Sequence, residues 1–209
     1  MTKHNLIRSL ILLWVVIGMS GCAQHLQRQT CMTLATDLDY CLAPLLQNSQ
    51  RSQSQRVNLE VDGKRHQLMS QLELSSEQLT LVGLAPLGQA LFTLTFDGEQ
   101  LNSEQSLLLG EQFKAEYLLG LLQLIYWPLD DVNRHLQGGV ITSSACEAVM
   151  CRKLYASGNI DDKNNDNSSE IIDISYSDRS LWQANIMLTL AQAKLTLKIT
   201  PIESQFRDH

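Results

Sequence analysis

Short runs of alternating apolar and polar residues, separated by turn residues, constrain the fold of this chain more than any other feature. The alternation is clearest at residues 57–61, 68–74 and 92–96. Asp62-Gly63 and Asp97-Gly98 follow the first and last of these runs, and Asp-Gly is a strong signal for a tight β-hairpin turn. Because the side chains of a strand point alternately to two faces, the pattern predicts an antiparallel meander with one buried and one exposed face.

Further strands are predicted on both sides of a central helical segment. They cover residues 79–84, a short stretch from Leu101, and residues 152–159, 171–176, 185–190 and 195–199. The stretch "DDKNNDNSSE", residues 161–170, contains no apolar residue. Such a stretch between two strands is predicted to be an exposed hairpin tip.

The central segment has the apolar period of a helix. The residues that recur at this spacing are Phe113, Tyr117, Leu118, Leu121, Leu124 and Ile125. Pro128 interrupts the pattern and suits the first turn of a second helix, which Gly138-Gly139 is predicted to end. Because the first helix is apolar on more than one face, it must be buried against the sheet.

These elements predict a mainly β (α+β) fold. About nine strands and two buried helices indicate one large antiparallel sheet that curls around the helices as a half-closed β-barrel. Such a barrel has an apolar interior and a mouth, and barrel mouths are common sites for hydrophobic ligands.

The first 22 residues have the layout of a secretory signal. Basic residues precede an apolar run at residues 10–17, and small residues precede Cys22. The run is short for a membrane-spanning helix. A cysteine in this position resembles a bacterial lipobox, which implies a signal peptide at 1–21 and acylation of Cys22. The alternatives are a plain signal peptide with a chance cysteine and an uncleaved anchor.

The resemblance to lipoprotein signals also implies a location. Ala23 follows Cys22, whereas an aspartate there is the usual inner-membrane retention signal of such lipoproteins. We therefore expect the protein at the outer membrane, facing the periplasm, and held by more than one acyl chain, as firm anchoring requires.

Charge excludes two classes of partner for the mature chain. Of the 209 residues, the 21 of the signal leave 188, a size typical of one domain. Two of the 16 Lys and Arg residues lie in the signal, so 14 remain against 22 Asp and Glu residues, a net charge of −8. Nucleic-acid binding needs a basic footprint, and electrostatic docking on anionic lipid needs basic residues, so neither is expected.

Four cysteines remain after Cys22 is assigned to the anchor. They are Cys31, Cys41, Cys146 and Cys151. An even number in an oxidising compartment is typical of disulfides, with free thiols as the alternative, and four cysteines allow three connectivities. The local pairs 31–41 and 146–151 are the simplest prediction. Without a CxxC motif or clustered histidines, no metal site is predicted.

The chain is divided into four segments. After the signal at 1–21, the Gln- and Ser-rich residues 22–55 are predicted to be a lipidated tether. Residues 32–46 within it carry leucines at positions 34, 38, 42 and 45, a spacing that predicts a short helix. Residues 56–202 form the barrel domain, and residues 203–209 are a C-terminal tail.

No motif for catalysis is present. The sequence contains no Gly-x-Ser-x-Gly elbow, no Gly-rich phosphate loop and no His-Glu-x-x-His. Asp130-Asp131 and Asp161-Asp162 are acidic pairs, but adjacent side chains diverge, and aspartate near a helix start is favourable by itself. We therefore predict no enzyme, no catalytic residue and no cofactor.

Two stretches carry a resemblance to a known family. "LVGLAPLGQALFTLTFDGEQL" and, after a spacer, "LLGLLQLIYWPLDDVNRHLQGG" resemble the core of LolB-type outer-membrane lipoprotein receptors. That pattern is a strand, Pro-Leu-Gly, a strand, and a helix leading to Pro-Leu. The match covers roughly residues 57–139. The chain is more similar still to a LolB-like lipoprotein family often encoded among aryl-polyene biosynthesis genes.

The resemblance implies a fold and a function. LolB shares with the periplasmic carrier LolA an unclosed β-barrel with helices as a lid. The implied function is to bind a lipid, polyene or lipoprotein acyl group and help transfer it to the outer membrane, with a periplasmic carrier as partner. The alternative is a non-enzymatic scaffold lipoprotein of an envelope or pigment-biosynthesis complex.

Leu87, in the turn Pro86-Leu87-Gly88, has two interpretations. Proline and glycine are ordinary turn residues, but a leucine between them is unusual because turn tips face water. In LolB-type receptors this leucine protrudes and helps to deliver cargo, so the resemblance implies a membrane-contact loop. The alternative is that Leu87 folds back onto the barrel rim.

Seven residues are candidates for the lining of the ligand cavity. They are Phe92, Leu94, Phe96, Leu118, Leu121, Leu122 and Trp127. The alternative is that they fill a core. Trp127 and Trp182 have the same two interpretations, as gates of the mouth or as packing anchors whose indole N–H finds a partner.

Overall fold

One large sheet forms most of the molecule. The computed structural model of the chain describes residues 26–28, 30–47, 49–109, 114–157 and 170–202. Within them, eleven antiparallel strands pair in the order β1-β8-β7-β6-β5-β4-β14-β13-β12-β11-β10, so β1 and β10 are free edges and the sheet is not closed. The strands are β1 (Leu26–Arg28), β4 (Arg51–Val61), β5 (Lys64–Leu74), β6 (Leu79–Leu84), β7 (Ala90–Phe96), β8 (Leu101–Gln105), β10 (Gly139–Ser144), β11 (Met150–Ala156), β12 (Glu170–Tyr176), β13 (Ile186–Leu190) and β14 (Leu195–Pro201).

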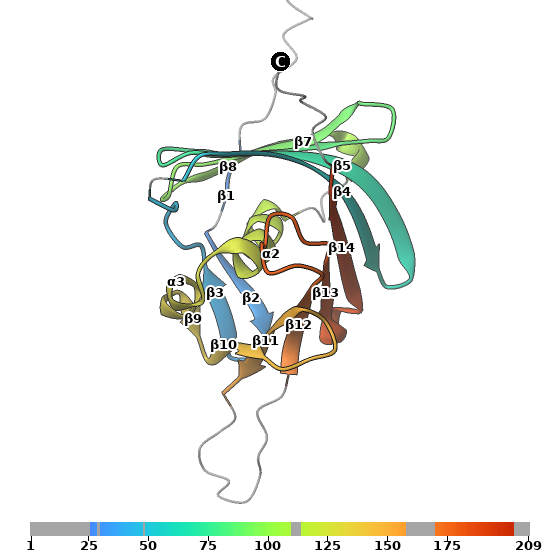
Figure 1. The fold of residues 1–209 in the computed structure, drawn as a ribbon. Helices are drawn as coiled ribbons and strands as arrows, with labels where there is room; N and C mark the ends of the chain where they lie inside the picture. The colour runs from blue at the N-terminus through green and yellow to red at the C-terminus, as the bar shows by residue number, and fades with distance from the viewer. Residues whose placement is uncertain (1–25, 29, 48, 110–113, 158–169, 203–209) are drawn as a thin grey trace, which may run out of the picture.

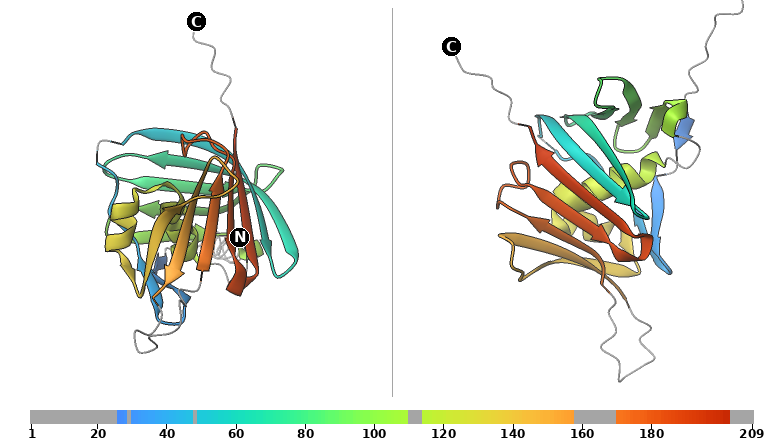
Figure 2. Two further views of the ribbon diagram at one scale, coloured as in Figure 1. Left: turned by 60° about the horizontal axis from the view of Figure 1, so that its bottom comes forward. Right: turned by 90° about the vertical axis from the view of Figure 1, so that its right-hand side faces the viewer.

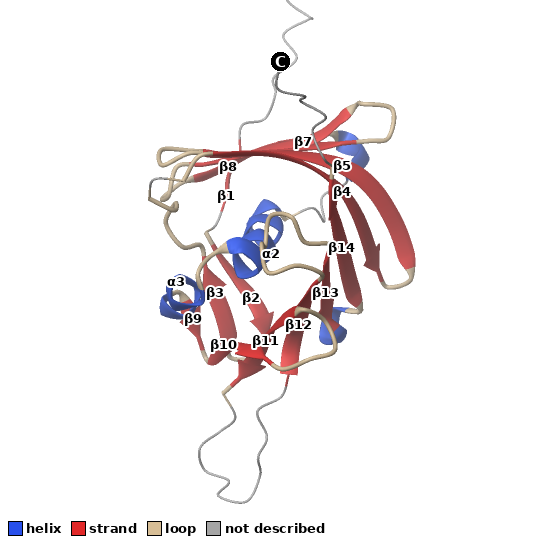
Figure 3. Ribbon diagram, in the orientation of Figure 1, coloured by secondary structure: helices blue, strands red, loops and turns tan. Residues whose placement is uncertain are grey.

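The sheet curls around a central helix, α2 (Ala115–Tyr126) (Figure 1). A second sheet, with strand order β2-β3-β9, lies with the short helix α3 (Leu129–Arg134) on the side of α2 that the large sheet leaves open (Figure 3). Its strands are β2 (Cys31–Ala35), β3 (Leu38–Cys41) and β9 (Leu136–Gln137), and two 3-10 turns are η1 (Leu107–Leu109) and η2 (Ala191–Ala193). The predicted antiparallel sheet around helices is therefore confirmed.

The first hairpin forms as its sequence predicts. β4 and β5 pair over their whole length, from Arg51 opposite Leu74 to Val61 opposite Lys64. The two residues between the strands, Asp62 and Gly63, both have positive φ, 49° and 77°. A two-residue hairpin turn requires positive φ at both positions, which Asp-Gly adopts readily.

The two predicted helices are confirmed, joined at Trp127-Pro128. Nine of the twelve residues of α2 are buried, as expected for a helix that is apolar on more than one face. The second helix is shorter than predicted. It ends at Arg134, because residues 136–137 leave the helix to pair as β9 with β3.

The predicted helix at residues 32–46, within a tether of residues 22–55, is wrong. Residues 31–41 form the hairpin of β2 and β3, and β4 already begins at Arg51. The buried residues of the hairpin, including Met32, Leu38 and Tyr40, belong to the main apolar cluster. The segment is therefore part of the fold.

Both disulfides join residues close in sequence. Cys31 pairs with Cys41, its direct neighbour across β2 and β3. Cys146 pairs with Cys151 within the hairpin of β10 and β11. The structure thus contains the local connectivity out of the three that the sequence allows. The predicted tip at 161–170 falls almost wholly on residues outside those described.

Candidate functional site

The seven candidate cavity residues lie on β7, on α2 and directly after α2. Six of them are buried and Leu118 is half-buried. All belong to, or pack against, one apolar cluster that extends over both sheets. In this structure they pack as a core, and an open cavity between them stays a prediction.

Gln123 fixes the end of α2 to the segment that follows β3. Its side-chain oxygen accepts hydrogen bonds from the Tyr40 hydroxyl and the Ala43 N–H, both at 2.8 Å, and its amide donates to the Ala43 carbonyl at 2.8 Å. Gln123 and Tyr40 are fully buried. Burial raises the pKa of the Tyr40 hydroxyl well above its ordinary value. The hydroxyl is therefore a neutral donor at physiological pH.

Arg152, on β11, also holds the end of α2. One guanidinium nitrogen donates to the Leu124 carbonyl at 3.1 Å and to the Trp127 carbonyl at 2.8 Å. The last carbonyls of a helix have no intrahelical partner and carry partial negative charge, so a cation is favourable there. Arg152 is only 6% exposed, and this burial lowers its pKa, opposed by nearby Tyr176. We interpret Arg152 as a cap of α2.

The two tryptophans occupy different environments. Trp127 is fully buried, and its indole N–H donates to the Pro44 carbonyl at 3.0 Å, as expected of a packing anchor. Trp182 is half-buried and stacks on Tyr126, with ring centroids 4.0 Å apart. The Arg51 guanidinium lies 5.0 Å from the centroid of the Trp182 ring. Of the two, Trp182 has the exposure that a residue at a mouth would need.

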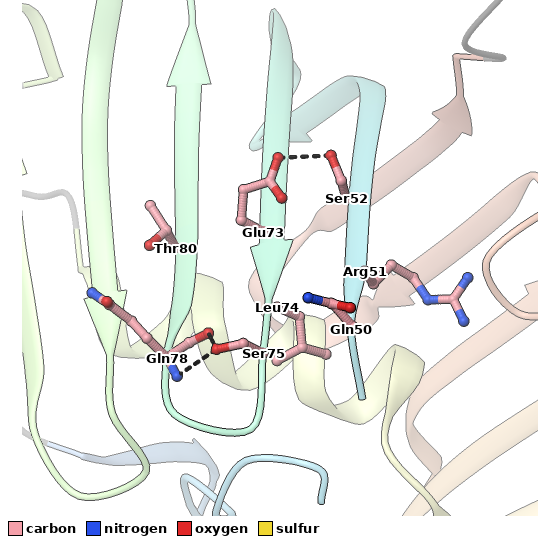
Figure 4. Close-up of a pocket in the computed structure, with 8 residues that line it drawn as sticks. All are labelled: Gln50, Arg51, Ser52, Glu73, Leu74, Ser75, Gln78 and Thr80. Atoms are coloured by element: carbon pink, nitrogen blue, oxygen red, sulfur yellow. Dashed lines mark hydrogen bonds between the residues drawn. The ribbon is translucent and has the colours of Figure 1, made fainter. Parts of the chain in front are cut away.

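A hollow of about 480 Å³ lies at the ends of β4, β5 and β6, close to Arg51 (Figure 4). Leu74 is its one apolar lining residue; the others are Gln50, Arg51, Ser52, Glu73, Ser75, Gln78 and Thr80. Glu73 accepts a hydrogen bond from Ser52 at 2.7 Å, and Arg51 points away from Glu73 in Figure 4. This polar lining does not suit an acyl chain, and none of the seven candidate cavity residues contributes to it.

The Pro-Leu-Gly turn presents Leu87 to solvent. The loop joins β6 to β7 and is closed by hydrogen bonds from Ala85 N–H to Gln89 O and from Gly88 N–H to Ala85 O, both at 2.8 Å. Gly88 has a φ of 83°, which glycine adopts without strain at the end of a three-residue hairpin loop. The Leu87 side chain is 99% exposed. The interpretation that Leu87 folds back onto the rim is therefore wrong.

Sequence analysis overlooked a second exposed leucine. Leu107, in η1 after β8, is also 99% exposed. It opens the run Leu107-Leu108-Leu109 directly after a strand. Three leucines at the end of an amphipathic strand cannot all face the core, and this signal could have identified the site.

The buried polar groups hold structure together and do not form an acid–base cluster. Among the described residues, the buried polar or charged side chains are those of Gln55, Ser70, Ser103, Gln123 and Arg152. Gln55 donates to the Tyr126 hydroxyl at 2.8 Å. Within the same residues, no three His, Cys, Asp or Glu side chains gather in a way that could hold a metal ion.

The predicted lipid anchor at Cys22 lies outside the described residues, as does the whole signal peptide. In the part of the chain that the structure describes, no helix is long and apolar enough to cross a bilayer.

Two comparisons with known proteins bear on identity. A search of curated proteins matches none to this chain. A family model described as "Protein of unknown function (DUF3261)" matches residues 52–203, which run from the first residues of β4 to the end of the large sheet. Since the match covers most of the chain, the protein belongs to the DUF3261 family.

Proposed function

We propose that this protein is an outer-membrane lipoprotein that binds a hydrophobic ligand in a LolB-like half-open barrel and helps to transfer it to the membrane. Cys22 carries the lipid anchor. The ligand is a lipid, an acyl chain or a polyene, and a periplasmic carrier delivers it. In this proposal α2 and α3 act as the lid of the barrel.

The observation that carries the proposal is the fully exposed Leu87 on a barrel built around an apolar helix. Residues 78–96, which form β6, the loop and β7, contain no charged residue. A leucine on an uncharged loop can enter acyl chains without burying a charge, whereas exposure to water has no benefit for its stability. The apolar residues around α2 would contact the ligand once the lid moves.

The test is to purify the mature chain with Cys22→Ala from its own host and to record its native mass. We expect a mass excess that organic extraction removes and identifies as a hydrophobic species. Leu122→Trp, at a buried position of α2 in the apolar core, should abolish the excess. Met187→Trp, at an exposed position of β13, is the matched control and should keep it.

Thermal unfolding of both variants separates loss of ligand from loss of fold, since overpacking a core costs about 1–3 kcal/mol. A folded wild-type protein with no mass excess would refute the carrier function.

A second candidate is the scaffold function. It is favoured by the packing of the interior, where six of the seven candidate cavity residues are buried. A scaffold needs an exposed patch but no cavity. A protein that carries no extractable ligand, yet co-purifies with a defined envelope protein in a manner abolished by Leu87→Asp, would establish this function.

A further inference from the structure

We infer that the barrel meets the lipid bilayer with one end of its sheet, and that Leu107 enters the acyl region beside Leu87. The inference rests on the proposed function for its membrane contact. It adds a second inserted residue and a fixed orientation of the domain.

Strand register brings the two leucines to the same end of the sheet. Leu87 lies in the loop between β6 and β7. Phe92, near the start of β7, pairs with Gln105 at the end of β8. One residue later, the Ser106 N–H donates to the Leu91 carbonyl at 2.7 Å. Leu107 therefore directly follows Ser106, which is hydrogen-bonded to Leu91. Leu91 lies near the start of β7, the strand that follows the Leu87 loop.

The two leucines lie in short uncharged stretches. Residues 78–96 contain no charge, and residues 105–110 contain none between the flanking Glu104 and Glu111. Both side chains are 99% exposed. Charged side chains are expensive within a bilayer, so uncharged tips with protruding leucines are suited to shallow insertion.

The first described strand, β1, starts towards the same end. β1 runs antiparallel to β8, with Arg28 opposite Leu101 and Leu26 opposite Ser103. Leu26, the first residue of β1, therefore lies towards the end of β8 that leads into η1. Figure 2 (right) shows both elements at the same margin of the large sheet. Cys22 precedes Leu26 by four residues, a span of at most about 14 Å in an extended chain. A lipid on Cys22 would hold this end close to the membrane.

The opposite end of the same strands has the reverse character. The turn from β5 to β6 contains Glu77, and the turn from β7 to β8 contains Asp97 and Glu99. All three are exposed. Insertion of this end would desolvate carboxylates, and an anionic surface would repel it. For β6 to β8 this contrast favours the orientation in which the end with Leu87 and Leu107 faces the membrane, while β5 runs on beyond Leu84 to the charged turn at residues 62–65.

The test uses the mature lipoprotein, extracted with its anchor from its host and reconstituted in vesicles of phosphatidylethanolamine and phosphatidylglycerol. Single cysteines labelled with the fluorophore NBD are introduced by Leu87→Cys, Leu107→Cys and Glu99→Cys. We expect blue-shifted emission, quenched by spin-labelled lipid, from the first two and water-like emission from the third.

A second set of variants tests cooperation between the two tips. With the probe at position 87, Leu107→Asp should shift emission towards that of water, and the control Met187→Asp should leave it unchanged.

The outcomes separate this inference from the proposed function. Immersion at 87 with water-like emission at 107 overturns the inference and leaves the function intact. Immersion at 99 overturns the orientation. Water-like emission at both leucines removes membrane insertion altogether, while extraction of a bound ligand still tests the carrier function independently.

Discussion

The two halves of α2 are held in place by different forces. Around residues 123–127, side chains from four strands (β3, β4, β11 and β12) and backbone groups of the segment after β3 form hydrogen bonds with the end of the helix. Along residues 115–122, the one side-chain hydrogen bond among the described residues joins the Tyr117 hydroxyl to the Thr33 carbonyl at 2.7 Å, and it is exposed. The remainder of that half packs through leucines of the apolar cluster.

The difference indicates which half could yield to a ligand. Breaking a buried hydrogen bond leaves a desolvated group and costs about 1–3 kcal/mol, whereas apolar contacts are non-directional and an acyl chain can replace them. α2 starts only a few residues after η1, which contains Leu107. We therefore expect the first half of α2 to move when the barrel opens and the second half to act as its fixed point.

Gln123→Leu should have the largest effect on the fixed half. The substitution leaves the Tyr40 hydroxyl and both backbone groups of Ala43 without their partner in the core. We expect a loss of about 3–5 kcal/mol in the free energy of unfolding, measured by urea denaturation. Leu121→Met, a volume-conserving change in the other half, should cost less than about 1.5 kcal/mol. Equal losses would show that the halves do not differ.

Arg152→Met should cost about 2 kcal/mol, less than the loss at Gln123. It leaves the Leu124 and Trp127 carbonyls unsatisfied, but it also removes a buried charge whose desolvation opposes folding. Arg152→Lys keeps the charge with a different geometry and should fall between wild type and methionine. A methionine variant as stable as wild type would show that Arg152 is not a cap.

Sequence patterns predicted nine of the strands and both helices, but not β1, β9, β10 or the hairpin at residues 31–41. Leu34, Leu38 and Leu42 are four residues apart, and this spacing fits one face of a helix as well as one face of a strand. The even-numbered residues 32, 34, 38, 40 and 42 are in fact the buried ones. Pairing with β9, almost a hundred residues later, decided between the two.

The groups that hold the end of α2 could not be predicted either, because their hydrogen-bond partners are distant in the sequence. Arg152 and Tyr176 lie in strands whose alternation was clear, but their targets are carbonyls of the helix 25–51 residues earlier. Only the curl of the sheet brings them there. By contrast, Leu87 was identified from its local turn chemistry alone, because the exposure of a hairpin tip depends on a few neighbouring residues.

Tyr176→Phe should have a smaller effect, and one that depends on pH. The hydroxyl donates to the Ile125 carbonyl at 2.8 Å, so its loss should cost about 1 kcal/mol at neutral pH. Burial raises the pKa of Tyr176 above its ordinary value, partly offset by Arg152.

A phenol with a raised pKa in the folded state contributes stability that is fully present below the unfolded pKa of about 10 and is lost as pH rises above it. The cost of Tyr176→Phe should therefore shrink above about pH 10, because the variant lacks one ionisation that favours unfolding. Urea denaturation at neutral and alkaline pH measures it. A cost that is the same at both would contradict this explanation. Burial also raises the pKa of Tyr40 and Tyr126, so alkaline unfolding should persist in the variant.

Gly120→Ala should have the smallest effect, because it falls in the half of α2 that we expect to yield. A Cβ at Gly120 would lie 2.2 Å from Cε of Met32 and 2.6 Å from its sulfur. The end of a methionine side chain can move, and alanine gains about 1 kcal/mol over glycine within a helix. We expect a net change of less than about 1 kcal/mol in the free energy of unfolding.

Gly83→Ala is the matched control, since its Cβ would lie at the same 2.2 Å from a ring carbon of Phe92. That ring is rigid and packed in the core, so the control should lose about 2 kcal/mol. If instead Gly120→Ala were as costly as Gly83→Ala, Met32 would have no room to move, and the first half of α2 would be as firmly fixed as the second.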